Sequence, residues 1–268
     1  MAYTQKIGAN NPGVILLLVD QSGSMSDDFQ GHGPKSAAAA LAVNRVIYEI
    51  QEASQAGEYI KDRCMVGVIG YGARVVPIAA GMISELAAQP KRVEQLQKKI
   101  GDGAGGLVEI QIEMPVWVDP VSENGTPMAE AFGVAHDLLL KSWIPAHPDS
   151  FPPVVINITD GEPNDMDAAR AQARRLMQLR TSDGNLLLFN AHISSKHSVE
   201  ARLPHSPTQL PDKYANFLFD ISSPLPDTLM GEAEKVGFSP QTGARAYVFN
   251  AGPETLIKLL TFGSSAMR

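Results

Sequence analysis

Short runs of consecutive apolar residues alternate along the chain with longer stretches in which apolar residues recur every three or four positions. The runs have the length of strands that are buried on both faces; they lie at 14–20, 64–71, 154–160, 185–193 and 245–250. The longer stretches have the period of helices with one buried face; they lie at 35–56, 127–142, 165–179, 228–236 and 253–261. Strands that alternate with helices predict a parallel sheet with right-handed crossovers.

A further short run, 74–79, follows the strand at 64–71 after a Gly-Ala turn and predicts a hairpin. We therefore expect an α/β fold: a doubly wound, Rossmann-like, mostly parallel sheet of six strands, with helices on both faces and one antiparallel edge strand. The whole chain, 1–268, is expected to form one domain with its core at about 13–262.

Residues 90–100 have helical spacing, with Pro90 near the start, and predict a further amphipathic helix. Two regions, 101–119 and 194–226, depart from the alternation of strands and helices. Four glycines lie within 101–106, so we expect irregular or hairpin-like structure at 101–119. Residues 194–226 are polar and rich in proline and predict a long irregular segment. We treat 101–119 and 194–226 as candidate inserted segments, which would carry partner specificity if they flank a binding site.

Composition narrows the classes of function. The 268 residues are 44% hydrophobic and 19% charged, which is typical of a globular protein. A net charge of −7 and a pI of about 5.4 argue against a nucleic-acid-binding or anionic-membrane surface. Cys64 is the only cysteine, so no intramolecular disulfide can form, which suits a reducing compartment. With a polar N-terminus and no apolar run of about 20 residues, we expect a soluble, cytoplasmic protein.

Oxygen-bearing side chains cluster where two of the most apolar strands end and where one helix begins. Ligands of parallel sheets bind beyond the carboxyl ends of the strands, so we expect these side chains to meet at one edge. Two carboxylates and three hydroxyls suit a hard cation, Mg²⁺ first and Mn²⁺ or Ca²⁺ as alternatives, and disfavour zinc. The candidate ligands are Asp20, Ser22, Ser24, Thr126 and Asp160.

Each of these residues also has a local explanation. Serine and aspartate favour turns and caps, and Thr126 directly before Pro127 is typical of a helix N-cap. Asp160-Gly161 is a common turn dipeptide. The acidic and amide side chains at 162–167 are expected to serve the start of the following helix. The set as a whole, rather than any single member, indicates a metal site.

Three sequence elements resemble those of the von Willebrand factor A (vWA) domain family. Residues 20–24, Asp-Gln-Ser-Gly-Ser, match its D-x-S-x-S element; residues 125–127, Gly-Thr-Pro, match its threonine loop; and residues 159–161, Thr-Asp-Gly, match its second aspartate loop. The elements occur in the order of the family, and the resemblance covers roughly 13–262. In that family they form the metal-ion-dependent adhesion site (MIDAS).

The resemblance implies a role for each residue. Ser22 and Ser24 would bind the ion directly, and Asp20 and Asp160 would bind it directly or through water. Thr126 would bind directly when a partner occupies the site and through water otherwise. A Glu or Asp of a partner protein would complete the coordination, since two carboxylates leave a divalent ion able to attract a third.

We therefore expect a metal-dependent protein–protein interaction module, not an enzyme. The short chain resembles bacterial intracellular single-domain members of the family, and some of those are similar to proteins encoded beside phosphatases, kinases or AAA+ ATPases, which are candidate partners. Two alternatives are a Mg²⁺-dependent hydrolase or phosphotransferase that uses the same cluster, and a scaffold with a vestigial metal site. Against the enzyme, the sequence has no G-x-x-x-x-G-K-[ST] loop and no G-x-S-x-G elbow.

Overall fold

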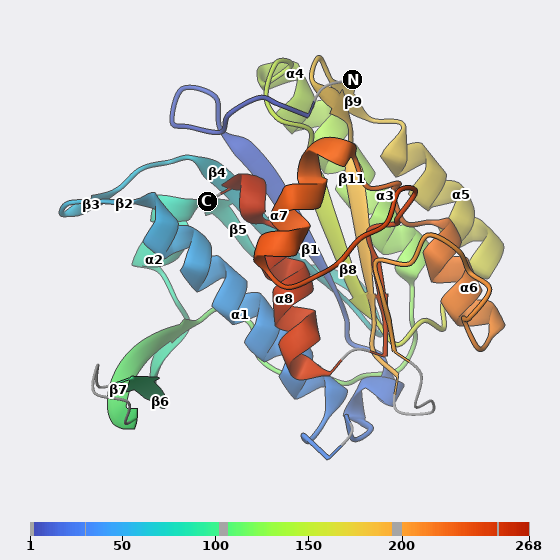
Figure 1. The fold of residues 1–268 in the computed structure, drawn as a ribbon, viewed down its shortest axis with the longest axis horizontal. Coiled ribbons are helices and arrows are strands. Elements are labelled where there is room, and N and C mark those ends of the chain that lie inside the picture. Colours follow the sequence, from blue (N-terminus) through green and yellow to red (C-terminus); the bar gives the residue numbers. More distant parts are fainter. Residues whose placement is uncertain (1–2, 30, 102–106, 195–199, 251, 268) are drawn as a thin grey trace.

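The computed structural model describes residues 3–29, 31–101, 107–194, 200–250 and 252–267 (Figure 1). Within these residues a central sheet of seven strands has the order β12-β13-β11-β8-β1-β4-β5. Five strands are parallel, and β5 and β12 run antiparallel at the two edges. The strands are β1 (Gly13–Asp20), β4 (Cys64–Tyr71), β5 (Val75–Met82), β8 (Val154–Thr159), β11 (Leu187–His192), β12 (Ala201–Arg202) and β13 (Tyr247–Phe249).

Helices cover both faces of this sheet (Figure 1). One face packs against α1 (Lys35–Ser54), α2 (Ile83–Ala88), α7 (Met230–Lys235) and α8 (Pro253–Gly263). The other face packs against α3 (Met128–Leu138), α5 (Met166–Met177) and α6 (Lys213–Asp220). Among the described residues, no helix combines the length and the apolar character needed to cross a membrane.

Shorter elements complete the described chain. A π-helical turn (Leu139–Trp143) and α4 (Ile144–Ala146) continue α3. Short 3₁₀ turns lie at η1 (Gly23–Ser26), η3 (Asp227–Leu229) and η4 (Ser265–Met267). Two small antiparallel pairs are β2 (Gln55–Ala56) with β3 (Tyr59–Ile60) and β9 (Arg180–Thr181) with β10 (Gly184–Asn185).

β1 lies at the centre of the sheet. It pairs in parallel with β4 on one side and β8 on the other, and Leu17 lies opposite both Val68 and Ile156. Successive side chains of a strand point to opposite faces: Leu17 belongs to the core cluster that includes α1 and α8, and Leu16 to the cluster that includes α3 and α5. Burial on both faces explains why the apolar run is uninterrupted.

The doubly wound α/β fold predicted from the sequence is confirmed, and so is the antiparallel edge strand β5. The number of strands differs, because the sequence predicts six and the described residues form seven. The seventh, β12, has only two residues and pairs antiparallel with β13. A strand of that length shows no period, so the hydrophobic pattern could not predict it.

The helix predicted at 90–100 is wrong. Residues 92–101 form a strand, β6 (Arg92–Gly101), which pairs antiparallel with β7 (Leu107–Val116) in a separate two-stranded hairpin. Figure 1 shows this hairpin standing apart from the central sheet. Helix propensity is a weak preference that cross-strand pairing can override. The hairpin-like structure expected at 101–119 is therefore present, but its first strand lies earlier in the chain, and residues 102–106 lie outside the described residues.

The sequence predicts an irregular segment at 194–226, but the described part of this segment is not irregular throughout. It contains β12 and the eight-residue helix α6. The Asp212 side chain caps α6 by accepting hydrogen bonds from the backbone N–H groups of Tyr214 and Ala215. Asp212 followed by apolar residues at helical spacing is a start signal that was present in the sequence. Residues 195–199 of this segment lie outside the described residues.

Candidate functional site

Three loops meet beyond the carboxyl ends of β1 and β8. Asp20 is the last residue of β1, and Asp160 directly follows β8, which pairs with β1 in parallel. Thr126 lies in the loop before α3. Because neighbouring parallel strands end at the same edge of the sheet, the topology brings Asp20 and Asp160 together, as the sequence predicts.

Hydrogen bonds tie the loop before α3 to the other two loops. The Glu123 N–H donates to the Gln21 carbonyl over 2.6 Å. The Thr126 N–H donates to Asn164 Oδ1 over 2.9 Å, and the Asn164 N–H donates back to the Thr126 carbonyl over 3.0 Å. Asn164 thus fixes the threonine loop against the loop after β8, a role that differs from the helix-start role predicted for 162–167.

Asp165 does serve that helix start, because its side chain accepts a hydrogen bond from the Ala168 N–H at the beginning of α5. The cap predicted at Thr126 is wrong. Pro127, rather than Thr126, is the N-cap of α3, and no side chain makes a capping hydrogen bond there. The Thr126 hydroxyl is therefore not used by the helix.

Asp20 is a buried carboxylate at the base of the site, 1% exposed. Its Oδ1 accepts a hydrogen bond from the Ser22 N–H over 2.8 Å, and its Oδ2 accepts one from the Thr159 hydroxyl over 2.6 Å. Burial, together with the negative charge of Asp160, raises the pKa of Asp20 to about 7. A cation held beside these two carboxylates would offset both effects.

Two serine hydroxyls lie directly beyond Asp20. Ser22 is buried and Ser24 is exposed, and their Oγ atoms are 3.1 Å apart, within hydrogen-bonding distance of each other. The pair therefore presents two oxygen atoms at one point of the edge, in the loop predicted to supply two ligands.

Asp160 has one satisfied and one unsatisfied oxygen. Its Oδ2 lies 3.4 Å from the ammonium group of Lys35, and its side chain is only 8% exposed. Its Oδ1 is buried and has no hydrogen-bond partner. Buried polar atoms are nearly always paired, so an unpaired carboxylate oxygen marks a place where a ligand fits.

His192 supports the loop after β8 from beneath. Its Nε2 lies 2.8 Å from the Asp160 carbonyl, which can only accept, so Nε2 donates and Nδ1 accepts from the Tyr247 hydroxyl at 3.1 Å. Burial lowers the pKa of His192 to about 4, which keeps the ring neutral. Gly161 has a φ of +95°, and a Cβ there would lie 2.6 Å from His192 Nε2, so only glycine fits.

The chemistry of the cluster fits a hard divalent cation. Among the described residues, no three His, Cys, Asp or Glu side chains form a cluster that could hold a metal ion. An ion at this site would therefore depend on the hydroxyls of Ser22, Ser24 and Thr126 in addition to Asp20 and Asp160. Oxygen atoms of this kind, with two negative charges, are the ligands that Mg²⁺ and Mn²⁺ prefer.

Sequence reasoning did not predict the contacts that Lys35, Asn164, Thr159 and His192 make at this site. Thr159 lies inside the Thr-Asp-Gly element and could have been found there. Lys35 has no motif around it, and its partner Asp160 is 125 residues away. His192 is the last residue of the neighbouring strand β11. Only the strand order and register reveal that it lies opposite Thr159, next to Asp160.

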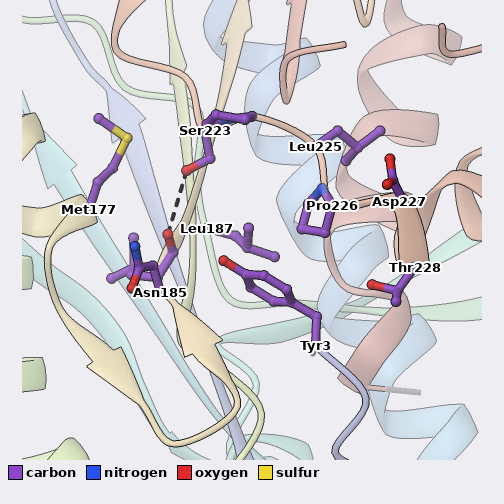
Figure 2. Close-up of a pocket in the computed structure, with 11 residues that line it drawn as sticks. Tyr3, Met177, Asn185, Leu187, Ser223, Leu225, Pro226, Asp227 and Thr228 are labelled. Atoms are coloured by element: carbon purple, nitrogen blue, oxygen red, sulfur yellow. Dashed lines mark hydrogen bonds between the residues drawn. The ribbon is translucent and has the colours of Figure 1, made fainter. Parts of the chain in front are cut away.

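A pocket of about 510 Å³ lies at the opposite end of the sheet (Figure 2). It lies at the amino end of β11, beside Leu187, and Tyr3, which precedes β1, lines its wall. The Ser223 hydroxyl donates to the Leu186 carbonyl over 3.5 Å at its rim. This pocket is separate from the cluster around Asp20 and Asp160.

No protein-family model and no curated protein matches the sequence. Solved structures are similar in fold at low identity. Manganese-loaded TRAP protein of Plasmodium vivax is 16% identical, with a TM-score of 0.37 over 68% of this chain and 57% of that chain. Proximal thread matrix protein 1 of the mussel byssus is 11% identical, with a TM-score of 0.49 over 97% of this chain and 47% of that chain.

The ArnB paralog VWA2 from Sulfolobus acidocaldarius is 14% identical, with a TM-score of 0.35 over 68% of this chain and 34% of that chain. This chain thus spans about half of the length of the TRAP and byssus proteins, and a third of VWA2. Similarity at this level does not assign a function to this chain.

Proposed function

We propose that this chain is a vWA-type interaction domain that binds a divalent cation and, through it, an acidic residue of a partner protein. Asp20, Ser22, Ser24, Thr126 and Asp160 would hold the ion. Mg²⁺ is the expected ion, with Mn²⁺ or Ca²⁺ as alternatives. The bound ion would supply the positive charge that attracts a carboxylate of the partner.

The observation that carries the proposal is the pair of buried carboxylates at one edge of the sheet. Burial, and after it the charge of Asp160, raises the pKa of Asp20, and Asp160 Oδ1 has no hydrogen-bond partner. Burying two neighbouring carboxylates with a single ammonium group, that of Lys35, beside Asp160 would be costly without a function. The paired hydroxyls of Ser22 and Ser24 would add ligands without adding charge.

We propose binding rather than catalysis at this site. A hydrolase would need a general base that is free to take a proton from water. Both ring nitrogens of His192 already make hydrogen bonds, to the Asp160 carbonyl and the Tyr247 hydroxyl. The Lys35 ammonium is paired with Asp27 and Asp160 and has no lone pair to offer.

Isothermal titration calorimetry with Mg²⁺ and with Mn²⁺ tests the ion site. The wild type should bind, and the double variant Ser22→Ala/Ser24→Ala should bind at least about tenfold more weakly. Ser26→Ala is the matched control, because Ser26 lies in the same loop but its hydroxyl bonds only the Gly23 carbonyl. Thermal unfolding in EDTA shows whether each variant is folded. Equal affinity of the wild type and the double variant would refute the ligand assignment.

Capture from native lysate, with Mg²⁺ or with EDTA, tests the role of the ion in partner binding. A partner retained by the wild type in Mg²⁺, lost in EDTA and lost in Ser22→Ala/Ser24→Ala supports a bridging ion. A partner that is retained in all three cases would contact the protein at another surface, without a bridging ion. Mg²⁺-dependent hydrolysis of p-nitrophenyl phosphate that disappears in Asp20→Ala would instead support the enzyme alternative.

A further inference from the structure

A buried ammonium group lies beside the candidate ion site. Lys35 is the first residue of α1, and its side chain is 3% exposed. Its Nζ lies 3.4 Å from Asp160 Oδ2, 3.3 Å from Asp27 Oδ2 and 3.3 Å from the Ser24 carbonyl. Lysine is almost never buried to this degree unless it is paired. The charge of Lys35 therefore belongs to the electrostatics of the site.

The two carboxylates around Lys35 differ in how much they need it. The Asp27 side chain is 53% exposed, so water compensates most of its charge. The Asp160 side chain is 8% exposed, so its charge depends on groups within the protein. Lys35 contacts only one oxygen of Asp160, and the other, Oδ1, is buried without a partner. The Lys35 ammonium group thus pairs with Asp160 Oδ2, and Oδ1 is open to a second cation.

We propose that Lys35 is a tethered cation that shares Asp160 with the divalent ion and sets how tightly the site takes up that ion. The proposal rests on the function proposed above. In the metal-free protein, Lys35 compensates the charge of Asp160. In the loaded protein, two cations share one carboxylate, and their repulsion in a poorly solvated site holds the affinity down. The site then loads most readily when a partner's carboxylate adds negative charge beside both cations.

Calorimetry with Mn²⁺ alone tests this proposal on the wild type and three variants. Lys35→Met removes the charge at nearly constant volume and should bind Mn²⁺ tighter, on the order of tenfold or more. Lys35→Arg keeps the charge and should bind Mn²⁺ more weakly than Lys35→Met. Lys141→Met is the matched control. Lys141 lies on the π-helical turn, away from the site, and is paired with the exposed Asp137 at the end of α3, so this substitution should leave the affinity for Mn²⁺ unchanged.

Thermal unfolding gives a second readout. In EDTA, Lys35→Met should melt at a lower temperature than the wild type, because Asp160 loses its counter-ion, whereas saturating Mn²⁺ should raise its melting temperature more than that of the wild type. If Lys35→Met does not fold, Asp27→Asn tests the proposal. Asp160 is then the only carboxylate paired with Lys35, so Mn²⁺ binding should weaken, and an unchanged or tighter affinity overturns the proposal.

The outcomes separate this proposal from the proposed function. Mn²⁺ binding of equal or lower affinity in Lys35→Met, with a wild type that binds, overturns the role of Lys35 and leaves the ion site standing. If Lys35→Met binds Mn²⁺ and the wild type does not, the result supports the role of Lys35 and overturns the proposed function of the wild-type chain. Binding in neither protein overturns both.

Discussion

Replacing Asp20 with asparagine should make the metal-free protein more stable. Asp20 is 1% exposed, and burial together with the charge of Asp160 raises its pKa from 3.8 to about 7. Each pKa unit corresponds to about 1.4 kcal/mol, so the ionised carboxylate costs the folded state roughly 4 kcal/mol relative to the unfolded chain. Asparagine has nearly the same shape and no charge, and it therefore removes this cost.

Part of that gain is lost through one hydrogen bond. Asp20 Oδ2 accepts from the Thr159 hydroxyl, and the amide nitrogen of asparagine cannot accept at that position. The bond to the Ser22 N–H can remain, because the amide oxygen still accepts it. A lost buried hydrogen bond costs about 1–3 kcal/mol, which leaves a net stabilisation of about 2 kcal/mol. The melting temperature should then rise by about 4–8 °C.

The gain should depend on pH in a defined direction. Between pH 4 and pH 7 the folded protein keeps a proton on Asp20 that the unfolded chain has lost, so the stability of the wild type falls as pH rises through this range. The advantage of Asp20→Asn should therefore be absent near pH 4 and complete at pH 8.

Urea unfolding in EDTA at the two pH values measures this difference. Asp220→Asn is the control, because Asp220 is an exposed carboxylate paired with Arg170 and should change stability by no more than about 0.5 kcal/mol. Mn²⁺ should stabilise the wild type and not Asp20→Asn. A variant that is no more stable than the wild type at pH 8 in EDTA would show that Asp20 is not an uncompensated buried charge.

Three further predictions concern the surrounding structure. Gly161→Ala should destabilise the fold by at least about 2 kcal/mol in urea unfolding, because φ is +95° and the new Cβ would meet His192; a neutral effect would contradict this conformation of the loop. Cys64, whose pKa burial raises to about 12, should react with Ellman's reagent at pH 8 only after unfolding, and a fast-reacting native thiol would count against its burial. Asn44→Ala should cost about 2–4 kcal/mol of unfolding free energy, because its side chain makes three buried hydrogen bonds to the backbone of 117–118, and a loss below about 1 kcal/mol would argue against them.

The sequence predicts the parts of this fold that have a strong local pattern. The buried run of β1 and the end of β8 are each recognisable alone, and parallel pairing then puts Asp20 and Asp160 at one edge. The predicted hairpin of β4 and β5 is likewise present, because a short turn joins two apolar runs. These features follow from side-chain period and turn chemistry, which act over a few residues.

The remainder depends on contacts between distant residues. The stretch at 92–101 contains good helix formers, and only its pairing with β7 makes it a strand. Lys35 reaches Asp160 across 125 residues of sequence, and Asn164 reaches Thr126 across 38. Neither contact has a local signal, because a lysine at a helix start and an asparagine before a helix are both common on protein surfaces.

The central place of β1 has a consequence for the newly made chain. β1 can pair with β4 as soon as residue 71 has left the ribosome, but its other neighbour, β8, is complete only at residue 159. At ordinary rates of synthesis this interval lasts on the order of ten seconds, during which one edge of β1, apolar from Val14 to Val19, has no native neighbour. The candidate ion site cannot exist in that interval either, since Asp160 and Asn164 are still to come. A nascent chain therefore cannot bind a partner through this site until β8 and the loop that follows it have been made.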